Sequence, residues 1–236
     1  MDYCFLLGQL ENADSFGELA PPLQIAIFLG AMSFATAALV SLTAFTRIII
    51  VLSFVRRALS TQEIPPNQVI MGLSFFLTLF VMAPTFENIN KNAITPYLDA
   101  QRQAPESEQK EFPVSKLWEK ASDEIEVFML DHTRASDLQL FVELSETPQP
   151  SLASDVPLQV LVPAFIISEL KTAFIMGFCI YIPFLLIDLV ISTVLMSLGM
   201  MMMPPVIVST PCKLLLFVLV DGWQLISKAL VSSFII

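Results

Sequence analysis

The chain has 236 residues, of which 55% are apolar and only 14% charged, and its formal net charge is −10. Soluble domains are about 45–50% apolar, and here the excess lies in long blocks, which is typical of membrane spans. The negative charge argues against a nucleic-acid partner, because phosphate contacts need clustered Lys and Arg. The cysteines, Cys4, Cys179 and Cys212, have no metal-ligand spacing, so we expect no metal site and no cofactor.

Residues 1–22 are expected to form a polar N-terminal segment. This segment carries four acids and no base. A secretory signal needs basic residues ahead of its apolar core, so we do not predict a conventional cleaved signal here.

A first helical hairpin is predicted over residues 23–86. Leu23 to Thr46 is an uncharged run of 24 residues, which is long enough to cross about 30 Å of hydrocarbon as a helix. That helix could continue as far as Leu59. The Pro65-Pro66 pair then indicates a turn, and a second apolar run follows it. For Arg47, at the edge of the first run, two alternatives stay open: its side chain reaches the membrane surface, or it pairs inside an assembly.

Residues 87–157 form the one soluble segment that the sequence predicts. Between Glu87 and Asp155 there are 14 acids and 6 bases. Apolar residues from Val114 to Val142, including Trp118 and Phe128, recur at helical spacing opposite a charged face, which predicts an amphipathic helix or a helix pair. His132 lies close to that apolar stripe, and we interpret it as an ordinary structural residue.

Residues 158–236 are predicted to form a second helical hairpin, with a methionine-rich loop and a C-terminal helix. Charges interrupt its apolar runs at Glu169, Lys171, Asp188 and Lys213. A charge at the centre of a membrane helix costs about 2.5–3.5 kcal/mol on insertion scales, so these side chains should face protein or water. Glu169 and Lys171 point to different sides of one helix, and each needs a partner on another helix, in another subunit or in water. Pro183 should kink or interrupt this helix.

The loop between the two apolar runs is the sharpest feature of the chain. It begins at Gly199 and ends with Pro204 and Pro205, and it contains four consecutive methionines: Met200, Met201, Met202 and Met203. A proline pushes the residue before it out of helical geometry, and non-helical backbone at membrane depth must be buried in protein or face water. In a ring of subunits these flexible, polarisable side chains would form an apolar collar that closes a pore. The alternative is a hairpin turn in which methionine fills gaps.

Charge also predicts a topology. Arg56 and Arg57 lie between the first two runs, whereas the long segment after the second run is acidic. The positive-inside rule therefore places the arginines in the cytoplasm, and the acidic segment and both termini outside.

Three stretches resemble the FliP family of flagellar export-apparatus proteins, which is similar to the SctR family of virulence type III secretion systems. They are TAFTRIIIVLSFVRRALSTQEIPPNQVIMGLSFFLTLFVMAPTF (Thr43–Phe86), HTRASDLQLF (His132–Phe141), and Pro163–Leu225, which contains SELKTAF, IDLVISTVLMSLGMMM and LFVLVDGWQL. Together they cover over half the chain in the order of the family. The DGWQL ending and the long acidic insert are more similar to flagellar members. Many members begin with a cleaved signal peptide, which we do not predict at this N-terminus.

The resemblance implies an all-α protein whose membrane-type hairpins assemble into an export gate. It implies a ring-like homo-oligomer, pentameric in the family, with FliQ-like and FliR-like subunits and with the FlhB-like and FlhA-like membrane proteins of the apparatus. Unfolded flagellar proteins would cross the bacterial inner membrane through it, at the flagellar basal body, with membrane lipid around the assembly and the acidic segment in the periplasm. The family's methionine-rich loop, which matches Met200–Met203, is a pore gasket. Its E-L-K element matches Glu169 and Lys171, which we interpret, with Asp188, as inter-subunit contacts.

We expect a protein without enzymatic activity, and three alternatives are kept. The first is the homologous SctR-type subunit of a virulence system. The second is an intramembrane aspartyl protease in which Asp188 and Asp221 share a proton, although Val218 and Val220 replace the glycine context of a G-x-G-D motif. The third is an ion-coupled transporter with Glu169, Lys171 and Asp188 as a relay, which no internal repeat supports.

Overall fold

The computed structural model describes residues 21–61, 64–98, 114–145, 156–200 and 203–235, and every regular element within these ranges is a helix. The helices 21–42, 67–98 and 158–197 are each long and apolar enough to cross a membrane, and the bent pair 205–219 and 222–232 is a fourth candidate if it counts as one span. The predicted all-α class with membrane-type helices is therefore confirmed. The chain divides into two units, residues 1–40 and 41–236.

Helix α2 (Pro21–Leu42) makes up the described part of the first unit. It begins at two prolines, whose missing N–H groups cost nothing in the first turn of a helix. The prediction of a helix that continues through Arg47 is wrong, because α2 ends at Leu42 and α3 begins at Phe45. At this break the Thr43 hydroxyl accepts a hydrogen bond from the Phe45 N–H at 3.3 Å, so a side-chain oxygen serves as acceptor in place of a backbone carbonyl of the helix.

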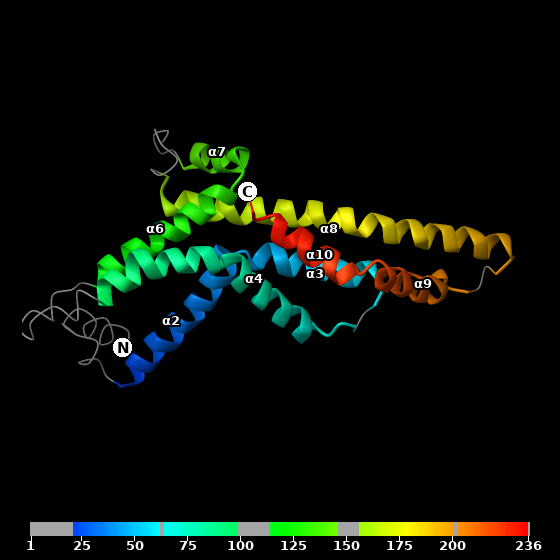
Figure 1. Cartoon of the computed structure of the whole chain (residues 1–236), viewed down its shortest axis with the longest axis horizontal. Coiled ribbons are helices and arrows are strands. Elements are labelled where there is room, and N and C mark those ends of the chain that lie inside the picture. Colours follow the sequence, from blue (N-terminus) through cyan, green and yellow to red (C-terminus); the bar gives the residue numbers. More distant parts are fainter. Residues whose placement is uncertain (1–20, 62–63, 99–113, 146–155, 201–202, 236) are drawn as a thin grey trace, which may run out of the picture. The chain divides into compact units, whose positions relative to one another are not determined.

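The second unit is built around α3 (Phe45–Ala58) and α8 (Leu158–Ser197), which pack along each other (Figure 1). One face of α3 is fully buried and carries Ile48, Val51, Leu52 and Val55, the spacing of an apolar helix stripe. After a turn, α4 (Asn67–Ile89) packs against α3.

Helix α4 does not end at its internal Pro84. It passes directly into η2 (Asn90–Ile94), a short π-helix, and helix continues to Leu98. The boundary that the sequence predicts after residue 86 therefore falls inside a continuous helical rod. The wider π turn brings Asn92 within 2.7 Å of Glu124, to which its amide donates.

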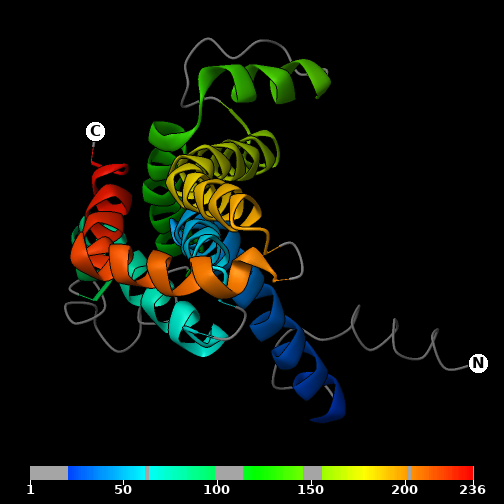
Figure 2. The ribbon, with the colours of Figure 1, turned by 90° about the vertical axis from the view of Figure 1, so that its right-hand side faces the viewer.

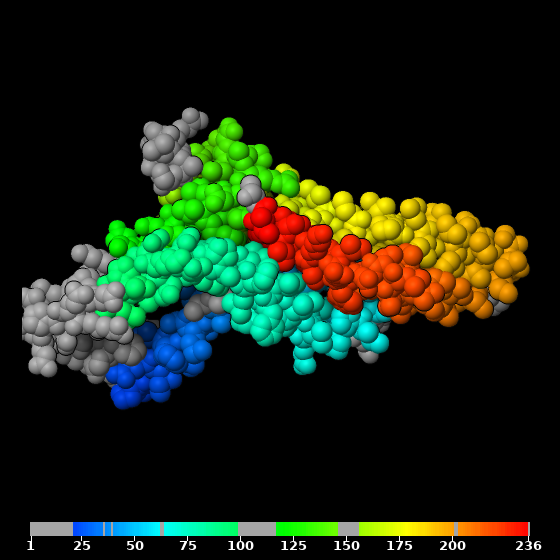
Figure 3. All heavy atoms as spheres, in the orientation of Figure 1, coloured from blue at the N-terminus to red at the C-terminus, as the bar shows by residue number. Residues whose placement is uncertain are grey.

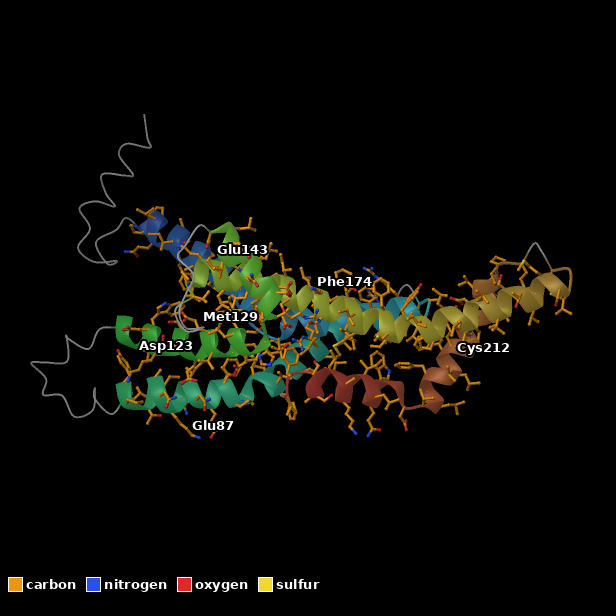
Figure 4. The ribbon with its side chains drawn as sticks, turned by 90° about the horizontal axis from the view of Figure 1, so that it is seen from above. Glu87, Asp123, Met129, Glu143, Phe174 and Cys212 are labelled. Carbon is orange, nitrogen blue, oxygen red and sulfur yellow. The ribbon has the colours of Figure 1, made fainter. Side chains whose placement is uncertain are left out.

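For the acidic segment the sequence predicts an amphipathic helix or a helix pair, and the structure has the pair, α6 (Val114–His132) and α7 (Ala135–Leu144). Helix α6 lies beside α4, with Glu87 and Asp123 on the two neighbouring helices (Figure 4). Phe128 and Met129 are buried. Trp118, which we expected in the same apolar stripe, is instead 73% exposed.

Helix α8 has 40 residues and continues through Pro163 and Pro183. Of the kink or interruption predicted at Pro183, the interruption therefore does not occur. At 1.5 Å per residue it is about 60 Å long, twice the thickness of a hydrocarbon core. Helix α9 (Pro205–Leu219) returns along α8, and α10 (Gly222–Ser232) follows it at an angle of 65°. Figures 2 and 3 show α9 and α10, in orange and red, on the surface of this unit.

Candidate functional site

An ion pair in which both partners are buried joins α3 to α8. Arg47 is 3% exposed and Glu169 is 0% exposed. The Arg47 Nε donates to Glu169 Oε2 at 2.7 Å, and the Arg47 Nη2 donates to the second carboxylate oxygen. This two-bond geometry is the strongest arrangement for a guanidinium and a carboxylate. Of the two alternatives for Arg47, the structure therefore has the paired one, within a single chain.

The same guanidinium also holds the end of α10. Its Nη1 donates to the carbonyl and the hydroxyl of Ser233, each at 3.0 Å. The Arg47 Cζ lies 3.8 Å from the centre of the Phe234 ring, within the range of a cation–π contact. Phe128 of α6 stacks on the same ring, with centroids 6.4 Å apart and an angle of 17° between the planes. Helices α3, α6, α8 and α10 thus meet at one charged centre.

His132 borders this centre, and its two ring nitrogens face backbone carbonyls. Nδ1 is 2.7 Å from the Phe128 carbonyl and Nε2 is 3.2 Å from the Phe234 carbonyl. These contacts fit the predicted structural role. A cavity of about 190 Å³ opens beside it between α4 and α6, lined in part by Thr85, Asn88 and Asp131.

A second buried charge joins α9 to α8. Lys213 is 1% exposed, and its ammonium donates to Asp188 Oδ2 at 2.5 Å and to the Ser60 hydroxyl at 2.7 Å. Ser60 follows α3 and adopts the left-handed conformation, with φ of 57°. The other oxygen of Asp188 is buried, with no hydrogen-bond partner among the described residues. One lysine therefore connects α9, α8 and the turn between α3 and α4.

Lys171, the remaining charge of the three predicted to make inter-subunit contacts, has a longer and more exposed ion pair than the other two. It is half exposed, and its Nζ lies 3.5 Å from Asp137 Oδ1 on α7. Nearby, the Arg134 guanidinium donates to the Thr172 hydroxyl at 3.2 Å. Glu169, Lys171 and Asp188 thus have three different partners in their own chain, and the inter-subunit contacts expected for them stay a prediction.

The turn between α8 and α9 is defined on both sides of the methionines. Gly199 has φ of +75°, its N–H donates to the Met196 carbonyl, and the Met200 N–H donates to the Leu195 carbonyl at 3.0 Å. These two bonds form a Schellman motif, which ends a helix at a left-handed glycine.

On the other side of the turn, Pro204 is extended, and Pro205 opens α9, where a missing N–H costs nothing. Pro204 thus precedes the helix, whereas Pro205, which the sequence analysis places in the turn, is the first residue of α9. Met200 and Met203 are exposed. Met201 and Met202 lie outside the described residues.

The two aspartates of the protease alternative have different surroundings. Asp188 is held by Lys213, whereas Asp221 is exposed at the bend between α9 and α10 with φ of 51°. Among the described residues, no three His, Cys, Asp or Glu side chains come close enough to hold a metal ion.

Sequence reasoning identified the charges that needed partners and missed most of the partners. The partners that complete the contacts of these charges are Arg47, Lys213, Asp137, Ser60, Ser233 and Phe234. The sequence did contain one signal for the partners. The apolar runs hold two acids, Glu169 and Asp188, and bases that include Arg47 and Lys213, and opposite charges in apolar surroundings are expected to pair.

Comparison with known proteins covers nearly the whole chain. A profile of the FliP family matches residues 28–230, which include Glu169, Lys171, Asp188 and their ion-pair partners. The chain is 52% identical over 211 residues to the flagellar biosynthetic protein FliP of Bacillus subtilis (strain 168), covering 89% of this chain and 91% of the relative. It is 48% identical to the protein of the same name from Pectobacterium carotovorum subsp. carotovorum (89% and 78%), and 40% identical to that of Aquifex aeolicus (strain VF5) (92% and 88%).

Proposed function

Because the chain belongs to the FliP family, we propose that it is a core channel subunit of the flagellar type III protein export gate. In this role it passes unfolded flagellar proteins across the bacterial inner membrane and catalyses no reaction itself. Its proposed partners are further copies of itself in a pentameric ring, FliQ-like and FliR-like subunits, and the FlhB-like and FlhA-like membrane proteins. The acidic segment, residues 87–157, lies on the periplasmic side in this proposal.

The turn from Gly199 to Pro205 is the observation that carries the proposal. A Schellman motif ends α8 at Gly199, and Pro204 and Pro205 fix the start of α9. The methionines are therefore confined to the short connection between the two helices. Apolar, flexible side chains in such a connection suit a seal that must exclude water and yet deform around a chain. Met200, Met201, Met202 and Met203 are therefore the proposed gasket.

The ion pairs support a structural role in preference to a proton relay or a protease. Glu169, Lys171 and Asp188 have separate partners, namely Arg47, Asp137 and Lys213. A relay would need these groups to exchange protons along one path, and a protease would need Asp188 to share a proton with a second carboxylate. A flagellar system is favoured over a virulence system because the relatives named above are flagellar biosynthetic proteins.

Export itself is tested by removing the chain from a flagellated host. Secretion of flagellar proteins should cease, and the wild-type chain should restore it. Continued secretion without the chain would disprove the gate role.

The gasket is tested separately by replacing Met200, Met202 and Met203 with Ala. Ion leakage through the cell membrane should rise, because smaller side chains leave water in the closed pore. Met71→Ala and Met196→Ala are matched controls, since both are exposed methionines outside the turn. Leakage equal to wild type in the triple variant would contradict the gasket.

A further inference from the structure

Helices α9 and α10 are joined by a sharp bend with an unusual backbone. The two helices meet at 65°, and the joint is Asp221, a residue other than glycine with φ of 51° and ψ of 48°. This left-handed conformation is unfavourable for L-residues, although aspartate tolerates it better than most. No side-chain capping hydrogen bond from Asp221 compensates for it.

The bend is also closely packed on one side. The Phe217 ring lies where a side chain on Gly222 would be, and a Cβ there would come within 2.3 Å of two ring carbons. Trp223 contacts the same ring edge-on, with centroids 5.2 Å apart. A cavity of about 250 Å³ lies next to these residues. The bent state therefore combines one unfavourable backbone conformation with the contacts of the Phe217 ring, to Trp223 and to Phe184 of α8.

The two arms of the bend are held very differently. Arg47, Phe128 and His132 hold the far end of α10 through Ser233 and Phe234. Helix α9 packs along α8, where Lys213 contacts Asp188 and Ser60 and the Phe217 ring lies 6.3 Å from that of Phe184. The far end of α9 is Pro205, next to the methionine turn. A change in the angle of the bend that leaves the Arg47 centre intact therefore moves α9 relative to α8.

We propose that Asp221 and Gly222 form a hinge about which α9 swings during export while α10 stays fixed. Asp221 alternates between the left-handed conformation of the bent state and a right-handed conformation that extends α10 into α9. The swing breaks the contacts of Lys213 with Asp188 and Ser60 and that of Phe217 with Phe184, and it displaces Pro205. This inference rests on the proposed export function and adds the moving element.

The test measures the angle directly in the full assembly. Spin labels are attached to Cys212 on α9, which is labelled in Figure 4, and to Lys228→Cys on α10; both positions are exposed. The background carries Cys4→Ser and Cys179→Ser, and labelled subunits are diluted with unlabelled ones so that distances within one chain dominate. Samples are compared at rest and with an exported protein arrested by a domain that cannot unfold.

The hinge predicts a second, longer distance in the arrested sample. Asp221→Gly tolerates the left-handed state and Asp221→Ala does not. The ratio of straight to bent states should therefore be roughly five- to thirtyfold higher in Asp221→Ala than in Asp221→Gly. The same two replacements at Gln224, an exposed residue in the regular part of α10, should leave the distances unchanged and control for helix propensity. Asp221→Asn, which keeps tolerance of the left-handed state, should behave as wild type.

Two results would overturn the hinge. One is a single, unchanged distance in every sample. The other is a shifted distance in Asp221→Ala with secretion at the wild-type rate, which would separate the bend from export. Neither result bears on the gate role, which stands or falls with secretion in cells that lack the chain.

Discussion

Gly177 of α8 lies against the ring of Phe54 of α3, so closely that an added Cβ would come within 2.6 Å of two ring carbons. The same ring contacts Phe174 edge-on, at a centroid distance of 5.6 Å. The central helix pair of the second unit thus approaches at a point where any side chain on α8 would collide with an aromatic ring.

We expect Gly177→Ala to destabilise the protein by about 1–3 kcal/mol, the usual cost of overpacking. Thermal unfolding of the purified protein measures this. Gly72→Ala is the matched control, because nothing lies within 4 Å of a Cβ at that position of α4, and it should stabilise by about 0.5–1 kcal/mol. Phe54→Leu should partly rescue Gly177→Ala; equal effects at both glycines would contradict the close approach.

Breaking the Arg47–Glu169 pair should be far more costly. Replacing either partner leaves an uncompensated buried charge, for which about 3–5 kcal/mol is typical. Arg47→Met or Glu169→Met should therefore lower the unfolding temperature strongly, and the double variant should be more stable than the sum of the two single effects predicts. Glu87→Gln is the control, since the Glu87–Lys91 pair is about two-thirds exposed and exposed pairs contribute little. Simple additivity of the two single variants would contradict a direct pair.

Two replacements of Ser60 separate its two roles. Both Ser60→Gly and Ser60→Ala remove the hydroxyl that Lys213 contacts, but only glycine relieves the left-handed backbone. The Ala variant should therefore be less stable than the Gly variant by about 1–2 kcal/mol. Equal unfolding temperatures would mean that the local backbone rearranges.

The acidic segment should show a pH effect at Glu126. Partial burial, together with the nearby Asp123, raises the pKa of Glu126 above its ordinary value. The folded state therefore binds the Glu126 proton more tightly than the unfolded state does. The ionised carboxylate destabilises the fold above the raised pKa, and this destabilisation disappears as the pH falls below that pKa. Glu126→Gln should raise the unfolding temperature at pH 7 and have a smaller effect under acid conditions. Glu119→Gln, at an exposed site on the same helix, should show no such trend; a gain independent of pH at Glu126 would contradict the mechanism.

The helices could largely be predicted from the sequence, because long apolar runs and a charged amphipathic stretch permit few alternatives. The breaks at Pro65-Pro66 and after Gly199 could be predicted as well, but other breaks could not. The end of α2 at Leu42 lies between two apolar stretches and depends on a local hydroxyl contact of Thr43. Conversely, Pro183 and Pro84 resemble helix breakers, yet both helices continue, since neighbouring groups can satisfy the freed carbonyls of a membrane-type helix.

For the candidate site, the sequence indicated which charges needed partners, whereas the choice of partner depends on tertiary packing. Arg47 and Glu169 are 122 positions apart, a separation that no local pattern connects. The π-helix Asn90–Ile94 also had no signal in apolar spacing, because the helix ends at Leu98 and too few residues follow the wide turn to show a shifted register.

The separation of Arg47 and Glu169 has a consequence for biogenesis. At about 5–20 residues per second, the ribosome adds the intervening residues in roughly 6–24 s, during which Arg47 has been made and its carboxylate partner has not. A lone guanidinium is costly in hydrocarbon. The segment that becomes α3 should therefore stay in water, in the lipid headgroups or in contact with another protein until α8 has been synthesised. Completion of the ion pair would then act as a checkpoint, and chains that stop before Glu169 should be preferred targets of membrane proteases.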